Sequence, residues 1–391
     1  MSEIRVKFEN TFHTAPTHVF SAPGRTELSG NHTDHQHGCV LAAAVELDTR
    51  AAIALNGSDT IRVLSEGYPL CEVDLRDLTI RQTEKNTTAA LIRGVAAGFA
   101  QRGCAVKGFD AYVTSTVLPG SGLSSSAAFE VMLGTAINHL FSGGADAVEI
   151  AKIAQFAENV YFGKPCGLMD QMASSVGGCV AIDFADPAAP VITPVDFDFS
   201  ACGHALCIID SGASHADLTD EYAAIPAELG AVCAVFGKTA LRDVPETDFY
   251  AALPRVRAVA GDRAVLRAIH IYDENRRVAA QVAALQRGDF NGFLRYVNLS
   301  GFSSQNLLQN VIPTGATAHQ EVALTLALAR HLLNGRGACR VHGGGFAGTV
   351  QAFVPDDMLP VFRTGIEAVL GKGSCHVLAI RPVGGTVLES E

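Results

Sequence analysis

The sequence predicts an α+β protein built from two lobes. Strand-like and helical segments are mixed along the chain without the regular β-α-β succession of a parallel doubly wound sheet. A chain of 391 residues that is 48% hydrophobic can bury a large core. Residues 186–190 read Asp-Pro-Ala-Ala-Pro, a short proline-rich segment. We take this segment as the boundary between an N-terminal lobe, 1–186, and a C-terminal lobe, 187–391.

Apolar runs separated by charged and polar turns predict most elements of the first lobe. We expect strands over 19–22, 39–44, 51–55 and 108–116, and a helix over 88–101.

A further helix is predicted from a capping signal near residue 146. Asp146 and Glu149 have the spacing of a capping box, and Gly163 is suited to the end of the helix. Its apolar stripe consists of Ile150, Ile153, Ala154, Ala157 and Tyr161. Glu158 lies beside this stripe, where a carboxylate requires a partner.

The second lobe shows the same mixture of elements. We expect strands over 205–210, 350–354 and 374–380, and helices over 217–236, 276–285 and 318–333.

Composition excludes several classes of protein. The 29 basic and 40 acidic residues give a formal charge of −11, which argues against a nucleic-acid surface. No basic start precedes an apolar run, and no apolar stretch reaches the ~18 residues of a membrane helix. The ten cysteines contain no Cys-x-x-Cys pair, so neither a zinc ribbon nor a disulfide framework is indicated. We expect a cytoplasmic protein that binds neither nucleic acid nor membrane, as a monomer or a weak homodimer.

A glycine-rich turn beside a small-residue helix start predicts a phosphate site. Glycines let the backbone approach an anion, and the free N–H groups and dipole of the following helix favour negative charge. The loop has neither the lysine of a Walker A motif nor the spacing of GxGxxG. The expected ATP-binding residues are Pro119, Gly120, Ser121, Gly122, Leu123, Ser124, Ser125, Ser126 and Ala127.

Two further segments connect this loop with a known family. Residues 23–34, Pro-Gly-Arg-Thr-Glu-Leu-Ser-Gly-Asn-His-Thr-Asp, resemble the sugar-binding signature of galactokinases. Residues 343–348, Gly-Gly-Gly-Phe-Ala-Gly, resemble the third motif of the GHMP kinase superfamily. With residues 167–171, four motifs occur in the order typical of the family and span about residues 20 to 355. The resemblance implies the two-lobed GHMP kinase fold with the active site between the lobes.

The resemblance also implies roles for individual residues. Asp170 faces the anomeric hydroxyl, and Arg25 lies beside it, orients it and neutralises charge near the γ-phosphate. An adjacent guanidinium lowers the pKa of Asp170, which keeps this carboxylate ionised. Ser126 and Glu158 match the family's Mg²⁺ ligands, a hydroxyl and a carboxylate of the hard-oxygen type that Mg²⁺ prefers. The expected sugar contacts are Arg25, Asn31, His32, Asp34, Gly167, Asp170 and Tyr222.

These matches predict a galactokinase activity, the ATP- and Mg²⁺-dependent phosphorylation of D-galactose at its C1 hydroxyl to give α-D-galactose 1-phosphate. Two departures from the family leave alternatives open. Asn31 stands where the family has a glutamate that accepts hydrogen bonds from the sugar, so a kinase acting on galacturonate or another galactose-like sugar is an alternative. The chain has no tryptophan to stack on adenine, which leaves the nucleotide base preference open.

Two other classes of function remain. A sensor that binds sugar without catalysis is one, although sensors related to galactokinases lack part of the Ser-Ser-Ser-Ala-Ala run that is intact here at 124–128. The other is a metal-binding module, since His32, Asp34, His35 and His37 are residue types that bind zinc.

Overall fold

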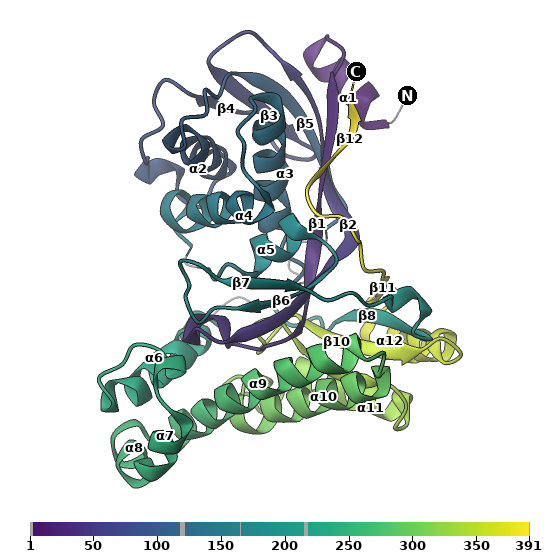
Figure 1. Cartoon of the computed structure of the whole chain (residues 1–391). Helices are drawn as coiled ribbons and strands as arrows, with labels where there is room; N and C mark the ends of the chain where they lie inside the picture. Colours follow the sequence, from purple (N-terminus) through teal and green to yellow (C-terminus); the bar gives the residue numbers. More distant parts are fainter. Residues whose placement is uncertain (1–2, 118–121, 165, 215–217, 391) are drawn as a thin grey trace.

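The computed structural model describes residues 3–117, 122–164, 166–214 and 218–390. A larger sheet with its helices lies against a smaller sheet with a second set of helices, and both termini lie at the same end of the larger sheet (Figure 1). The α+β prediction is confirmed.

Among the described residues, eight strands form the larger sheet. Its main path is β12 (Thr386–Ser390), β1 (His18–Ser29), β2 (Cys39–Leu55), β5 (Phe109–Ser115), β3 (Thr60–Ser65) and β4 (Cys71–Asp74). The first part of β2 instead pairs with β6 (Cys179–Asp183), which pairs with β7 (Val191–Pro194). β3 and β5 run parallel, and the other pairs are antiparallel.

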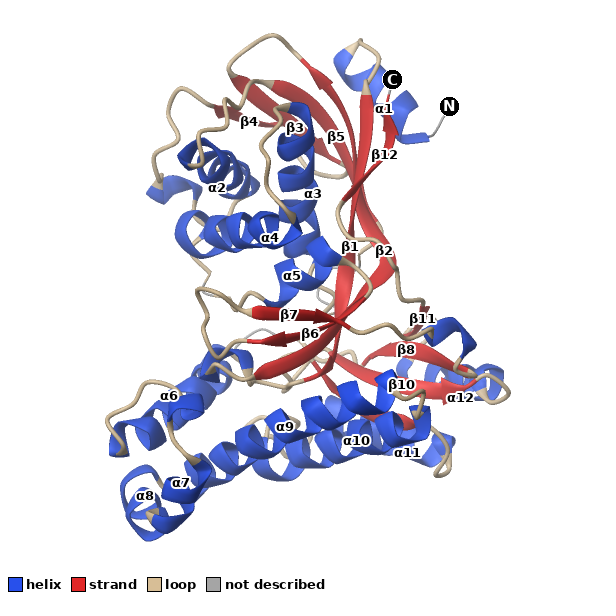
Figure 2. Cartoon of the chain, in the orientation of Figure 1, coloured by secondary structure: helices blue, strands red, loops and turns tan. Residues whose placement is uncertain are grey.

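The two faces of this sheet are covered by different helices. Ala51 and Ile53 of β2 belong to the core formed with α2 (Thr88–Gln101), α3 (Ser125–Leu140) and α4 (Ala147–Phe156), which share one side of the sheet (Figure 2). Ala52 and Ala54 point to the opposite face and pack against α1 (Glu3–Phe12). This division follows from the alternation of side chains along a strand. α5 (Met169–Val176) packs near the start of β2, on Val40 and Ala42.

The smaller sheet is antiparallel, with the order β11 (Cys375–Leu378), β8 (His204–Asp210), β10 (Thr349–Pro355) and β9 (Ala338–His342). Cys207 and Ile209 pack under α11 (Glu321–Leu333) and α12 (Leu359–Leu370). Leu206 and Ile208 face the other way, where one apolar core includes α9 (Asp262–Gln286), α10 (Phe290–Ser303) and residues of β1 and β2. This shared core joins the two sheets. A helical extension is formed by α6 (Thr219–Val235), α7 (Glu246–Ala251) and α8 (Leu253–Ala260).

The predicted elements agree with the structure in type but differ in extent. The predicted helix at 88–101 is confirmed, whereas the strands at 39–44 and 51–55 are one strand, β2. The helix expected from Asp146 has its capping box but changes at Ala157 into a π-helical turn, η3 (Ala157–Phe162), which ends at Gly163. The boundary at residue 186 stays a prediction. The strands β7 and β12 lie beyond residue 186 in the sequence but belong to the larger sheet.

The cysteines and the helices bear on two further expectations. All ten cysteines are free thiols in the structure. Within the described ranges, no helix has both the length and the apolar character needed to cross a bilayer.

Candidate active site

Arg25 joins three motifs at the centre of the candidate active site. It lies on β1 between two irregularities of the pairing with β2, at 23/25 and 27/29, and such bulges redirect side chains. Arg25 Nε donates to Asp170 Oδ1 at 2.7 Å, and its Nη1 donates to the carbonyl of Gly122. Ser124 Oγ donates to the second oxygen of Asp170, also at 2.7 Å. The sugar signature, the phosphate loop and the start of α5 therefore meet at one carboxylate.

The charge state of Asp170 follows from these contacts. Burial favours the neutral acid, but the charge of Arg25 and the hydrogen bonds from Arg25 and Ser124 hold the pKa of Asp170 below its usual value. The direction is the one that the sequence predicts. An ionised carboxylate with a fixed orientation can align a hydroxyl and accept its proton.

The described part of the phosphate loop begins at Gly122; Pro119, Gly120 and Ser121 lie outside the described residues. Gly122 has φ +71°, and Ser124 adopts the left-handed conformation at φ 58° and ψ 66° immediately before α3. A non-glycine residue in this region is strained, which is common at functional sites. The backbone N–H of Arg25 donates to the carbonyl of Leu123 at 3.0 Å, so β1 anchors the loop against the N-terminus of α3.

Glu158 is 2% exposed, and the structure supplies the partners that its position beside the apolar stripe requires. Its Oε1 accepts from Ser126 Oγ at 3.2 Å and lies 3.4 Å from Lys164 Nζ. Its Oε2 accepts from Gln171 Nε2 at 2.7 Å and from the Cys166 thiol at 3.2 Å. The hydroxyl of Ser126 and the carboxylate of Glu158 thus form a pair of hard oxygen donors beside the N-terminus of α3.

Gln171 links Glu158 to a second buried carboxyl group. Its Nε2 also lies 3.2 Å from Oε2 of Glu130, which is fully buried on α3, four residues after Ser126. Burial and the neighbouring charge of Glu158 raise the pKa of Glu130 well above its usual value. Sequence reasoning missed both residues, although the i, i+4 spacing places Glu130 on the same face of α3 as Ser126.

A pocket of about 230 Å³ opens next to Arg25. It is lined by Arg25, Glu27, Gly30, Asn31, His32, Asp34, His35, Met169, Gly343 and Gly344. The structure therefore brings together four of the predicted sugar-binding residues. Glu27 and Met169 were not among the predicted residues, although Glu27 lies inside the signature and Met169 precedes Asp170.

Gly167 lies against the side chain of Asp34, one of the residues that line the pocket. A Cβ at this position would lie 2.1 Å from Asp34 Oδ2, so only glycine lets the carboxylate lie against this backbone. Burial and the charge of Asp170 raise the pKa of Asp34, with nearby His32 acting in the opposite direction.

The loop of the third motif faces the sugar signature. Asn31 Nδ2 donates to the carbonyl of Gly343 at 2.6 Å, and His32 Nε2 lies 3.0 Å from the carbonyl of Gly344. Tyr222 on α6 donates its hydroxyl to the carbonyl of Gly345 at 2.7 Å, and burial raises the pKa of Tyr222 to about 12. Tyr222 thus supports the glycine loop, and its contact with a sugar stays a prediction.

The histidine cluster does not have the geometry of a zinc site. His32 Nδ1 lies 3.2 Å from His35 Nε2, and burial together with His32 lowers the pKa of His35 to about 3. In the described ranges no group of three His, Cys, Asp or Glu side chains is placed to hold a metal ion.

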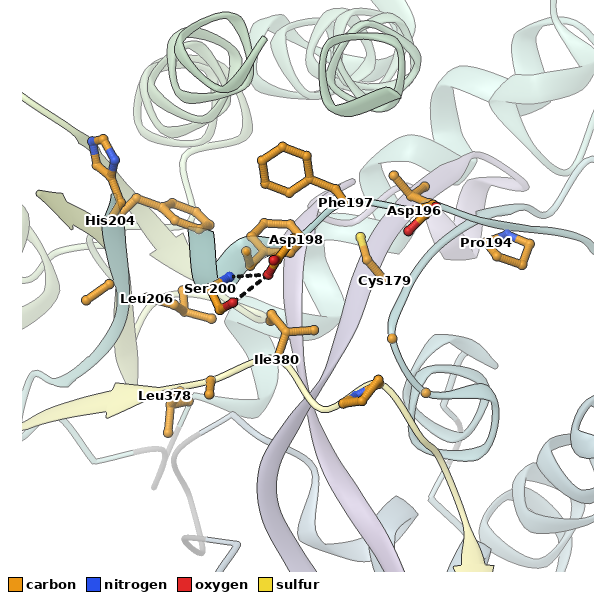
Figure 3. A pocket seen from close by; sticks show the side chains of 18 of the residues that line it. Cys179, Pro194, Asp196, Phe197, Asp198, Ser200, His204, Leu206, Leu378 and Ile380 are labelled. Atoms are coloured by element: carbon orange, nitrogen blue, oxygen red, sulfur yellow. Dashed lines mark hydrogen bonds between the residues drawn. The ribbon is translucent and has the colours of Figure 1, made fainter. Parts of the chain in front are cut away.

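A larger hollow of about 760 Å³ lies away from these motifs (Figure 3). It is enclosed by the end of α5, the segment 194–200 and the segment 378–382. Its walls are mainly apolar, and Oδ1 of Asp198 already accepts from the backbone N–H and the hydroxyl of Ser200 (Figure 3). No lysine or arginine is among the described residues that line it, so it lacks the cations that a phosphoryl-transfer site requires.

Comparisons with known proteins cover nearly the whole chain. Residues 6–55 match the model of the galactokinase galactose-binding signature, and residues 90–178 match that of the GHMP kinases N-terminal domain. A galactokinase of Streptomyces coelicolor is 32% identical over 353 residues, which are 89% of this chain and 87% of that protein. The crystal structure of Lactococcus lactis galactokinase complexed with galactose has a TM-score of 0.83 and 25% identity, covering 98% of both chains. L. major mevalonate kinase shares the fold, with a TM-score of 0.63 and 16% identity over 95% of this chain and 97% of that one.

Proposed function

This chain belongs to the galactokinase family, and we propose that it transfers the γ-phosphoryl group of ATP to the C1 hydroxyl of D-galactose, giving α-D-galactose 1-phosphate. The observation that carries the proposal is the position of Asp170. One of its oxygens accepts a hydrogen bond from Arg25, which lines the pocket, and the other accepts one from Ser124 of the phosphate loop. A group placed between a sugar site and a phosphate site is suited to phosphoryl transfer between them.

In this proposal the chain mainly positions the reactants. The N-terminus of α3 and the loop before it bind the phosphates of ATP. Asp170 orients the C1 hydroxyl and accepts its proton as transfer proceeds, while Arg25 keeps Asp170 ionised and offsets negative charge near the γ-phosphate. His32 and Asp34 supply hydrogen-bonding groups to the sugar.

Ser126 and Glu158 fit a magnesium ion, because both offer hard oxygen atoms. They would hold Mg²⁺, which when bound neutralises charge on the phosphate oxygens of ATP. Glu158 is fixed for this role by Gln171 and Cys166 on its other oxygen.

The first test compares sugars as phosphoryl acceptors. Purified protein with ATP and Mg²⁺ should consume ATP with D-galactose, and more slowly with D-galacturonate, glucose, N-acetylgalactosamine or arabinose. Preference for galacturonate would replace the proposed substrate with the alternative drawn from Asn31. Sugar binding without turnover on any of these sugars would replace the kinase with a sugar sensor.

A second test concerns the support of Glu158. Replacing Gln171 with leucine removes the amide that bonds Glu158 Oε2 at 2.7 Å. We expect the Mg²⁺ concentration for half-maximal activity to rise by about 10–100-fold, the range typical of lost outer-shell partners of a metal site, with kcat largely recovered at saturating Mg²⁺.

A matched control for this test is Gln281→Leu. Gln281 is a fully buried glutamine of α9, and no described residue hydrogen-bonds its side-chain amide. This variant should leave the Mg²⁺ requirement unchanged. An equal shift in both variants, or none in Gln171→Leu, would contradict the role of Gln171.

A further inference from the structure

The carboxylate of Glu27 lies in the sugar pocket on the same strand as Arg25. Between the two bulges of β1 the pairing with β2 is regular, from Arg25 opposite Ala44 to Glu27 opposite Ala42. Residues two apart on a regular strand point to the same face. Glu27 is 5% exposed and lines the pocket together with Arg25.

One oxygen of Glu27 is occupied and the other is open. Oε1 accepts from Asn31 Nδ2 at 3.2 Å and from Nη2 of Arg340, which is fully buried. No described residue donates a hydrogen bond to Oε2. A buried carboxylate is stable only when its charge is compensated, and here Arg340 does so from behind while Oε2 keeps its capacity to accept.

Asn31, in contrast, has no free hydrogen-bonding capacity. Its amide group donates to Glu27 Oε1 and to the carbonyl of Gly343. Its amide oxygen accepts from Asn310 Nδ2 at 2.8 Å and from Ser304 Oγ at 3.3 Å. An asparagine side chain offers two N–H groups and two lone pairs, so all four positions are used within the protein. Asn31 is only 1% exposed. Its side chain therefore forms part of the pocket wall and has no position left to hydrogen-bond a ligand.

We propose that Glu27 is the specificity-determining residue of this pocket, accepting a hydrogen bond from a sugar hydroxyl through Oε2 and disfavouring sugars that carry a carboxylate. The inference rests on the proposed sugar-kinase function and narrows its substrate to neutral hexoses. A hydroxyl facing Oε2 donates to it, whereas a uronate group at the same place is repelled by a second negative charge. Asn31 stands where the family has a glutamate, but the pocket still contains a carboxylate, that of Glu27.

The wild-type protein provides the first measurement. Calorimetric titration should show D-galactose binding at least about tenfold more tightly than D-galacturonate, and this comparison requires no turnover. Equal binding, or tighter binding of galacturonate, overturns the role of Glu27. Absence of ATP consumption with a normal binding preference would refute the kinase and leave the specificity of Glu27 intact.

The second measurement uses the variant Glu27→Gln, which keeps the shape of the side chain and removes its charge. We expect KM for D-galactose to rise by about tenfold with a smaller change in kcat, and the ratio of kcat/KM for galactose over galacturonate to fall at least tenfold. An unchanged ratio in the folded variant would show that Glu27 serves only as the partner of Arg340. If the single variant does not fold, Glu27→Gln combined with Arg340→Met removes both buried charges, and the same shift in the ratio is expected.

Asp48→Asn is the matched control. Asp48 is a buried carboxylate paired with Arg50 and Arg381, and it is not among the residues that line the pocket. Loss of its charge should lower stability and leave the ratio of the two sugars unchanged. A similar fall in the ratio for Asp48→Asn would show that the effect of Glu27→Gln arises from general destabilisation.

Discussion

The variant Asp170→Asn is expected to lose about 10²–10⁴-fold in kcat, the contribution typical of a positioned general base. The amide still accepts one hydrogen bond, so the side chain can stay in place between Arg25 and Ser124. It cannot take up a proton, and its charge no longer balances Arg25. Because the proposed sugar contacts at His32 and Asp34 are unaltered, the Kd for D-galactose measured by calorimetry should change little.

Asp262→Asn is the control for this comparison. Asp262 also lies in the first turn of a helix and accepts from an arginine Nε, that of Arg257 at 2.5 Å, but this pair is exposed at the surface of α9. This variant should keep the wild-type kcat. Full activity of Asp170→Asn would remove Asp170 from the mechanism, and loss of galactose binding along with turnover would assign it to the sugar site alone.

The fold could be predicted where the residue pattern is local. The helix α2 was found with its bounds, and the capping box of α4 is present as predicted. β2 was divided into two strands because Glu46, Asp48 and Arg50 interrupt its apolar pattern. Asp48 is compensated by Arg381, 333 positions away, and the sequence gives no sign of such a partner. β12 was missed for a similar reason, since it pairs with a strand at the other end of the chain.

The candidate site could be predicted where motifs mark it. The phosphate loop, Arg25, Asp170 and the Ser126–Glu158 pair are brought together as the resemblance implies. The remaining residues carry no local signal of their own. Glu27 lies in a buried strand, and its contacts with Arg340 of β9 and with Asn31, together with its place in the pocket lining, are seen only in the structure.

Polar residues at strand and helix positions also concealed element boundaries. The strand predicted over 19–22 continues to Ser29. Its second part was not predicted, because Arg25 and Glu27 stand where a buried strand normally has apolar residues. The π-helical turn η3 interrupts the helix at Glu158, and such turns often occur at functional sites. The pattern fails at positions occupied by residues of the candidate site, where local sequence rules are often broken.

The largest expected effect on stability comes from Glu274 of α9, which is hydrogen-bonded to Gly30 in the segment 23–34. This carboxylate is fully buried, and its Oε1 accepts from the backbone N–H of Gly30 at 3.1 Å and from Ser300 Oγ at 2.6 Å. Its Oε2 accepts from Arg277 Nε at 2.6 Å. Glu274→Ala leaves Arg277 without its buried counter-charge, and removing one partner of such a pair typically costs about 3–5 kcal/mol in the free energy of unfolding. Urea denaturation would measure this loss.

The pH dependence of stability provides an independent check on the same residue. Burial opposes ionisation, but Arg277 and its neighbours hold the pKa of Glu274 far below the usual carboxyl range. A carboxyl group with a depressed pKa stabilises the fold above its unfolded pKa of about 4.3, and this contribution is lost as pH falls toward the folded value. The free energy of unfolding should therefore decline more steeply below about pH 4.3 in the wild type than in Glu274→Ala.

Glu367→Ala, which breaks the exposed pair with Arg363 on α12, should cost at most about 0.5 kcal/mol and keep the wild-type pH profile. Equal losses in the two variants would show that the buried network of Glu274 stabilises the protein no more than a surface pair does.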